Sequence, residues 1–100
     1  MDLKKIQQKI WDNKLDKGFN TTNVEKEFCL TQGELSECFN SYNKKKDDVG
    51  EELADVFIYL LALSKMLDVD LEEEVMKKVD KNEKREYKKI NGVVTRTKEA

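Results

Sequence analysis

Proline and histidine are absent from this 100-residue sequence, and glycine occurs only four times. Proline and glycine are frequent in the turns of β-sandwiches and barrels, so their scarcity argues against those folds. Charged residues, chiefly Lys and Glu, make up 40% of the chain, which is typical of proteins built from helices. The composition therefore predicts an all-α fold with a single core.

Cysteine is also scarce, with only Cys29 and Cys38 present. Both fall inside one predicted helix, where their separation corresponds to about 13 Å of helical rise, too far for a disulfide. The missing histidine excludes a Cys/His zinc site. Two unpaired thiols are typical of a reducing compartment. The sequence thus predicts a cytoplasmic protein.

The chain has neither a long apolar run nor an excess of one charge. The longest apolar stretch, residues 56–63, is far too short to cross a bilayer, and the N-terminus lacks the apolar region of a signal peptide. The formal net charge is only −2, which gives the surface as a whole no attraction for nucleic acid or an anionic membrane. We expect neither of these partners, and any anion site must be local.

Apolar residues recur at helical spacing in four segments. We expect helices over residues 3–17, 22–42, 48–67 and 70–90. Gly18 is a typical residue just past a helix end, and Asn91-Gly92 gives the same signal after the fourth segment. The sequence therefore predicts an all-α, four-helix-bundle-like domain over residues 1–90, followed by a polar tail over residues 91–100.

Two pairs of acidic residues break the amphipathic pattern of the second and third predicted helices. Between residues 53 and 63 every residue except Asp55 is apolar or aromatic, and Glu52 lies on the same side of the helix. Glu34 and Glu37 lie beside the apolar stripe of the preceding helix. Residues three apart share one helix face, so the two pairs meet in one pocket if the helices pack antiparallel.

Four carboxylates in one pocket repel one another unless a cation lies between them. Hard oxygen ligands without His or Cys favour Mg²⁺, or Mn²⁺ in its place. The alternative is that Glu-rich helices supply acids everywhere, and that Glu34 and Glu37 lie near a core by chance with lysines neutralising them. This alternative is weaker for Asp55, which has no basic residue three or four positions away.

Basic residues dominate the fourth predicted helix, mostly as a solvated face. Asn82 falls at an inward position, with Lys78 and Arg85 about one turn to either side, and these three are candidates to bind phosphate oxygens. A purely structural role is the alternative. Phe19 lies in a predicted loop, with little helical reason to be apolar, so it is a candidate for stacking on a nucleobase.

The spacing of the acids resembles that of the MazG-like all-α nucleoside triphosphate pyrophosphohydrolases, whose pattern is E-x-x-E, a variable spacer and E-x-x-D. The stretch GELSE, the fourteen spacer residues from Cys38 to Glu51 and then ELADVFIYLLALSKMLDVDL are similar to that pattern. Lys-Gly-Phe at 17–19 and KVDKNEKR at 78–85 resemble the flanking segments of the branch that includes dCTP pyrophosphatases.

The resemblance implies an enzyme that uses Mg²⁺ to hydrolyse (deoxy)nucleoside triphosphates to the monophosphate and pyrophosphate, as part of nucleotide-pool house-cleaning. The implied metal ligands are Glu34, Glu37, Glu52 and Asp55, and the implied substrate-binding residues are Phe19 at the base and Lys78, Asn82 and Arg85 at the phosphates. We hypothesise that Glu34 or Glu37 is also the catalytic base that takes the proton of the attacking water.

The family acts as dimers or as dimers of dimers, so the resemblance implies a homodimer or a dimer of dimers. The third predicted helix supports this independently, since a helix that is apolar all round needs more cover than one short chain offers. Two alternatives to the implied activity stay open. One is a phosphoribosyl-ATP pyrophosphohydrolase, and the other is a non-catalytic helical metal-binding interaction module.

Overall fold

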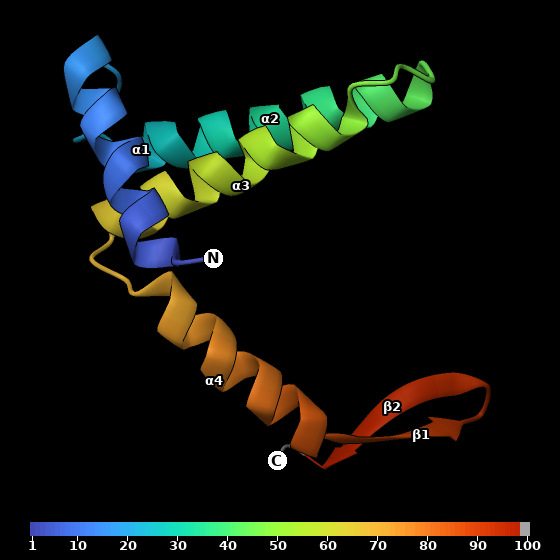
Figure 1. Ribbon diagram of the computed structural model, residues 1–100. Helices are drawn as coiled ribbons and strands as arrows, with labels where there is room; N and C mark the ends of the chain where they lie inside the picture. Colours follow the sequence, from blue (N-terminus) through green and yellow to red (C-terminus); the bar gives the residue numbers. More distant parts are fainter. Residues whose placement is uncertain (99–100) are drawn as a thin grey trace. The chain divides into compact units, whose positions relative to one another are not determined.

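The computed structural model of the chain describes residues 1–98. It contains four helices, α1 (Leu3–Lys17), α2 (Val24–Asn43), α3 (Val49–Met66) and α4 (Leu71–Lys84), and two strands, β1 (Glu86–Ile90) and β2 (Val93–Lys98) (Figure 1). The predicted all-α, bundle-like fold is confirmed, with the strands as an addition to it. Within the described residues, no helix combines the length and the apolar character that crossing a bilayer requires.

The chain divides into two compact units, the first covering residues 1–70 and the second beginning at residue 71. In the first unit, α2 and α3 run side by side as an antiparallel pair, and α1 packs against α3 (Figure 1). Gln7 ties α1 to α3, because its side-chain amide donates to the Leu61 carbonyl at 3.1 Å and to the Ser64 hydroxyl at 2.7 Å. This unit carries all the acidic residues of the predicted site.

A residue in the left-handed backbone conformation follows each of three helices. Gly18, Lys45 and Asp68 follow α1, α2 and α3 with φ of 70°, 56° and 56°. After α2, the Lys46 amide donates back to the Ser41 carbonyl at 2.9 Å, which closes the last turn in the manner of a Schellman motif. The short connection between α2 and α3 therefore has a defined shape, and the antiparallel register of the two helices follows from it.

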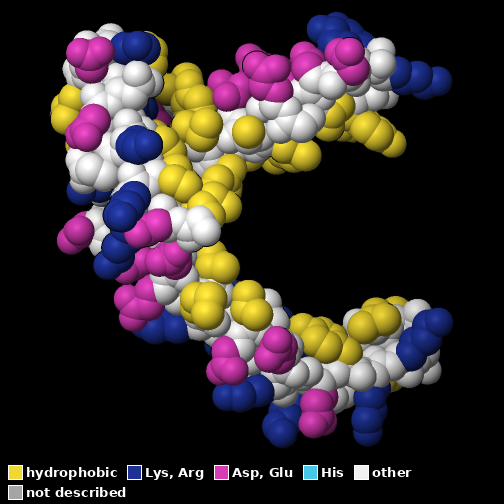
Figure 2. Space-filling view, in the orientation of Figure 1, with side chains coloured by type: hydrophobic (Ala, Val, Ile, Leu, Met, Phe, Trp, Pro, Cys, Tyr) yellow, Lys and Arg dark blue, Asp and Glu magenta, His cyan; other side chains and the backbone are white. Residues whose placement is uncertain are grey.

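The first unit has a small apolar core and a broad apolar surface. Among the described residues, the buried hydrophobic side chains are Cys38, Leu61, Ala62 and Leu63. The sequence predicted α3 to be buried all round, but in the single chain Leu53 is 54% exposed. The reason is that α1 covers only the C-terminal part of α3. Figure 2 shows hydrophobic side chains along one edge of the α2–α3 pair and acidic side chains along the other.

The second unit consists of α4 and a β-hairpin, and here the expectation for the fourth helix is wrong. The helix ends at Lys84, not near residue 90, and β1 pairs antiparallel with β2 from Ile90↔Val93 onward. Asn91 and Gly92 have φ of 51° and 80°, as the central residues of a type I′ turn require. Strand β2 occupies residues 93–98 of the segment that was predicted as a polar tail, and residues 99–100 lie outside the described part.

Candidate functional site

Acidic side chains from α2 and α3 meet where the two helices face each other. Glu34, Glu37 and Glu52 each offer a carboxylate oxygen, and these oxygens lie within 4.8 Å of one another. Glu34 and Glu52 are half-buried, whereas Glu37 is exposed. Asp55 is half-buried on the same face of α3, one turn after Glu52. We call these four residues the acid cluster.

The acid cluster is electrostatically unfavourable in the metal-free protein. Burial raises the pKa of Glu34, and the charges of Glu37, Asp55 and Glu52 raise it further. Burial also raises the pKa of Glu52, followed by the charges of Asp48 and Asp55. Both effects favour the protonated carboxyl, and a bound cation would reverse them. Asp55 therefore belongs to the cluster electrically, although its oxygens are not among the three closest.

Two buried carboxylate oxygens beside the cluster have no hydrogen-bond partner: Glu52 Oε2 and Asp48 Oδ1. Asp48 is the N-cap residue of α3, yet its side chain makes no capping hydrogen bond. Buried polar atoms are almost always paired, and a hard divalent cation such as Mg²⁺ is a suitable partner for carboxylate oxygens. The donor set thus fits such an ion. In the sequence, Asp48 was marked only as the first residue of a predicted helix.

A cavity of about 270 Å³ lies between α1, α2 and α3. Its lining residues are Lys9, Ile10, Asn13, Lys14, Phe19, Glu27, Ile58, Tyr59 and Ala62. We call it the aromatic cavity, because two aromatic side chains contribute to its wall. Phe19 is held there by the end of α1, where its amide donates to the Lys14 carbonyl at 2.9 Å. The predicted base-stacking residue therefore lines a cavity of the first unit.

An ion pair is buried in the wall of the aromatic cavity. Lys14 Nζ lies 2.9 Å from Glu27 Oε2, with side-chain exposures of 9% and 0%. The Asn20 amide donates to the other oxygen of Glu27 at 3.2 Å. Proteins tolerate buried charges when these are paired and hydrogen-bonded, as Lys14 and Glu27 are. The sequence did not single out either charged residue, because each falls on a helix rich in Lys and Glu.

Tyr59 connects the aromatic cavity to the acid cluster. It lines the cavity, and the Lys14 ammonium lies 5.8 Å from the centre of its ring. Burial raises the pKa of the Tyr59 hydroxyl, and the charges of Glu34 and Glu27 raise it further. The hydroxyl therefore stays protonated at neutral pH, and it lies near enough to these acids for their charges to act on it. In the sequence, Tyr59 read as part of the apolar stripe, although it follows Asp55 by one turn.

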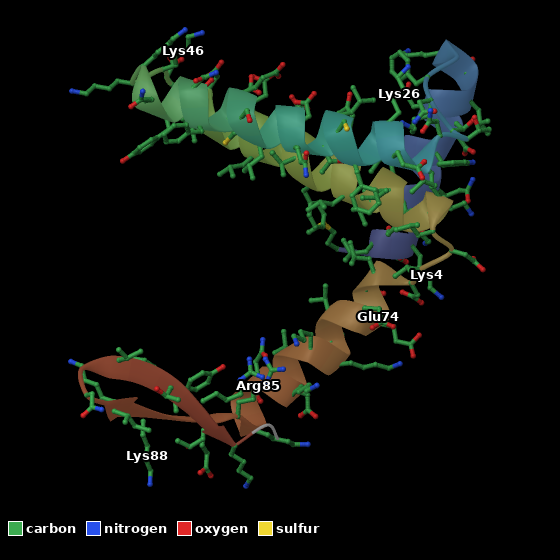
Figure 3. All side chains as sticks on the ribbon, turned by 180° about the vertical axis from the view of Figure 1, so that it is seen from behind. Lys4, Lys26, Lys46, Glu74, Arg85 and Lys88 are labelled. Atoms are coloured by element: carbon green, nitrogen blue, oxygen red, sulfur yellow. The ribbon has the colours of Figure 1, made fainter. Side chains whose placement is uncertain are left out.

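A second, polar cavity of about 210 Å³ opens at the turn between α2 and α3. Its lining residues are Glu37, Asn40, Ser41, Lys44, Lys46, Asp48 and Glu52. We call it the lysine cavity. It shares Glu37 and Glu52 with the acid cluster, so the two features are continuous. Figure 3 shows Lys46 at this turn, at the far end of α2 from Lys26.

The remaining predicted residues lie in the second unit. Lys78 and Asn82 belong to α4, and Arg85 follows its last residue (Figure 3). The Arg85 guanidinium donates to the Asn82 side-chain oxygen at 2.9 Å. Lys78 and Asn82 are both exposed within this unit, so the inward position expected for Asn82 is not observed there. The phosphate-binding role of all three stays a prediction.

Comparison with protein families matches residues 22–99 to the model described as the MazG-like family. The matched segment contains the whole acid cluster and the three predicted phosphate-binding residues of the second unit. It begins after Phe19 and α1. Neither the curated proteins nor the solved structures contain a significant match to this chain.

Proposed function

The chain belongs to the MazG-like family, whose members are generally nucleoside triphosphate pyrophosphohydrolases that use divalent metals, and we propose that it hydrolyses (deoxy)nucleoside triphosphates to monophosphate and pyrophosphate. The proposal rests on one observation: carboxylate oxygens of Glu34, Glu37 and Glu52 lie within 4.8 Å of one another. Two buried carboxylate oxygens at the same place, on Glu52 and Asp48, have no hydrogen-bond partner. The flanking segments resemble the dCTP pyrophosphatase branch, so deoxynucleotides are the first substrates to test.

In this proposal the acid cluster holds the cation and positions the attacking water. Glu34, Glu37, Glu52 and Asp55 would be the ligands of Mg²⁺, or of Mn²⁺ in its place. When bound, the ion neutralises the triphosphate and lowers the pKa of water near it. The water oxygen forms a bond to the α-phosphorus, the bond from that phosphorus to the pyrophosphate oxygen breaks, and Glu34 or Glu37 accepts the water's proton.

The nucleobase would lie in the aromatic cavity, between apolar walls that include Phe19. The buried Lys14–Glu27 pair makes the same wall partly polar, which suits a planar heterocycle with polar edges. Lys78, Asn82 and Arg85 are proposed to contact the phosphates. We place the protein in the cytoplasm, in keeping with its free thiols at Cys29 and Cys38.

We further propose that the working form is a homodimer or a dimer of dimers. The apolar edge of α2–α3 supports this, because Leu35, Phe39 and Tyr42 of α2 are 57%, 62% and 68% exposed. Monomeric proteins rarely leave so continuous an apolar surface open. These residues lie away from the acid cluster on α2, so a second copy could cover them without blocking it.

The proposed activity is tested by measuring pyrophosphate release from ribo- and deoxyribonucleoside triphosphates and from phosphoribosyl-ATP, with Mg²⁺ and with chelator, and by identifying the nucleotide product. We expect the monophosphate and pyrophosphate in equal amounts, only with metal. Release from phosphoribosyl-ATP alone would establish the alternative pyrophosphohydrolase. Metal-dependent stability without turnover of any substrate would establish the non-catalytic metal-binding module.

The variant Glu37→Gln keeps the size of an exposed side chain but removes its charge from the acid cluster. We expect it to lower kcat by at least about a hundredfold, the usual contribution of a general base, with an unchanged helical circular dichroism spectrum. Glu25→Gln, which removes an exposed acid from the first turn of the same helix, is the matched control. A Glu37→Gln enzyme that keeps most of its activity would rule out the assigned role.

A further inference from the structure

Three features follow one another along the α2–α3 pair. The aromatic cavity includes Glu27 of α2, the acid cluster includes Glu34 and Glu37, and the lysine cavity includes Lys44. Glu27 and Glu34 are seven positions apart, and so are Glu37 and Lys44, which corresponds to about 10 Å of helical rise in each case. The features are thus ordered and evenly spaced, with the acids in the middle.

The shape of the turn determines which lysines reach the lysine cavity. Lys44 is the C-cap of α2, and Lys45 adopts the left-handed conformation with φ of 56°. The Lys45 amide donates to the Tyr42 carbonyl at 3.0 Å, and the Lys46 amide donates to the Ser41 carbonyl at 2.9 Å. This backbone arrangement directs Lys44 and Lys46 to the cavity, while Lys45 is not among its lining residues.

The two lysine side chains at this cavity are not neutralised by the acids beside them. In the described part of the chain, neither the Lys44 nor the Lys46 ammonium has a carboxylate within 4.0 Å, although Glu37, Asp48 and Glu52 line the same cavity. The site therefore combines cation-binding carboxylates with two free ammonium groups. The ligand that satisfies both is an anion that coordinates a metal and also accepts hydrogen bonds, which is the chemistry of a polyphosphate.

We propose that Lys44 and Lys46 bind the terminal phosphates of the substrate, so that pyrophosphate leaves at the α2–α3 turn and the base lies at the opposite end, in the aromatic cavity. This inference rests on the proposed function for the identity of the substrate. It adds a direction for the substrate along α2–α3 and two positioning residues that lie between the second and third predicted helices. The acid cluster then lies where the α-phosphate must be.

The test is the affinity of the full chain for inorganic pyrophosphate in the presence of Mg²⁺, measured by isothermal titration calorimetry at fixed ionic strength. We expect the double variant Lys44→Gln/Lys46→Gln to weaken pyrophosphate binding on the order of tenfold or more, because two charge-assisted hydrogen bonds are lost. Binding of a nucleoside monophosphate should change by less than about twofold. Lys45→Gln is the matched control, and it should bind pyrophosphate as the wild type does.

A double variant that binds pyrophosphate within about twofold of the wild type would overturn the inference, and so would an equal loss in Lys45→Gln, which would indicate a general charge effect. A wild-type chain that does not bind pyrophosphate would overturn it as well. The readout does not require turnover. If the wild type fails to hydrolyse any triphosphate but the lysines still control pyrophosphate binding, the proposed function fails and the polyphosphate site stands.

Discussion

The acid cluster places like charges together at the cost of folding free energy. Glu34 and Glu52 are half-buried, and the pKa of each is raised by burial and by neighbouring carboxylates. A protein gains nothing from such a cluster unless a ligand uses it, and functional sites are where local rules of stability are commonly broken. The cost should therefore be measurable and should depend on both pH and metal.

We predict that the metal-free protein loses stability as the pH rises above about 4.5, the ordinary value for Glu34 and Glu52. A carboxyl whose pKa is higher in the folded than in the unfolded state binds more protons when folded. Its contribution to the free energy of unfolding therefore falls as the pH rises from the unfolded pKa through the folded one. Urea unfolding in chelator at a series of pH values measures this.

The variant Glu52→Gln isolates the effect of the cluster from that of other titrating groups. In chelator, its free energy of unfolding relative to the wild type should increase as the pH rises, because it removes one acid and relieves Glu34. Added Mg²⁺ should stabilise the wild type above pH 5 more than the variant. A difference between the two proteins that does not change with pH would contradict the assigned electrostatics.

The buried Lys14–Glu27 pair could not be predicted from a sequence so rich in charged residues. Both residues lie on helices in which charged side chains are the rule, and burial at 9% and 0% exposure depends on how α1 crosses the α2–α3 pair. No local pattern encodes that crossing. The acids of α3, by contrast, could be recognised from a local pattern, because Asp55 interrupts an apolar stretch and Glu52 precedes it by one turn.

At the level of elements, the helices of the first unit followed from helical periodicity and from a clear stop signal at Gly18. The structure brings Glu34, Glu37 and Glu52 together as antiparallel packing requires. What periodicity did not predict are the residues placed by the turn. Asp48, Lys44 and Lys46 owe their positions to a closed α2 end with Lys45 in the left-handed conformation, which helical periodicity does not encode.

The hairpin of the second unit was not predicted, because the Asn-Gly pair is common in two different structural contexts. It commonly follows helix ends, and it is also the strongest short signal for a type I′ hairpin turn when β-branched residues flank it. Here Ile90 precedes the pair, and Val93 and Val94 follow it. These β-branched neighbours favour the hairpin interpretation, and α4 accordingly ends at Lys84.

We predict that Gly92→Ala destabilises the hairpin selectively. Its φ of 80° is costly for any residue with a Cβ, by about 1 kcal/mol. Hydrogen exchange should become faster at the amides of β1 and β2, with α1, α2 and α3 unaffected. Gly50→Ala is the control, because Gly50 is helical with open space around it and alanine favours helix there. Unchanged hairpin protection in Gly92→Ala would show that the turn does not hold the strands together.

At the scale of the whole molecule, the first unit has too small a core for the apolar surface it carries. Its buried hydrophobic residues cluster at Leu61–Leu63 and Cys38, while the apolar edge of α2–α3 remains exposed. Residues of this edge recur at helical spacing on both helices, with Leu35 and Phe39 on α2 and Leu53 and Phe57 on α3. The regular pattern argues for a helical partner surface that packs along the pair.

We predict that the protein is a homodimer or a dimer of dimers at micromolar concentration, and light scattering should give at least twice the mass of one chain. Phe39 is 62% exposed, so Phe39→Glu should leave the fold of the single chain intact while placing a charge in the proposed interface. We expect this variant to scatter as a smaller species, at the monomer mass if its interface is the only one. Ser36→Glu, an exposed position of the same helix outside the apolar edge, is the matched control and should keep the wild-type mass. A wild-type mass equal to one chain would reject the dimer, and the apolar edge would then need a different explanation.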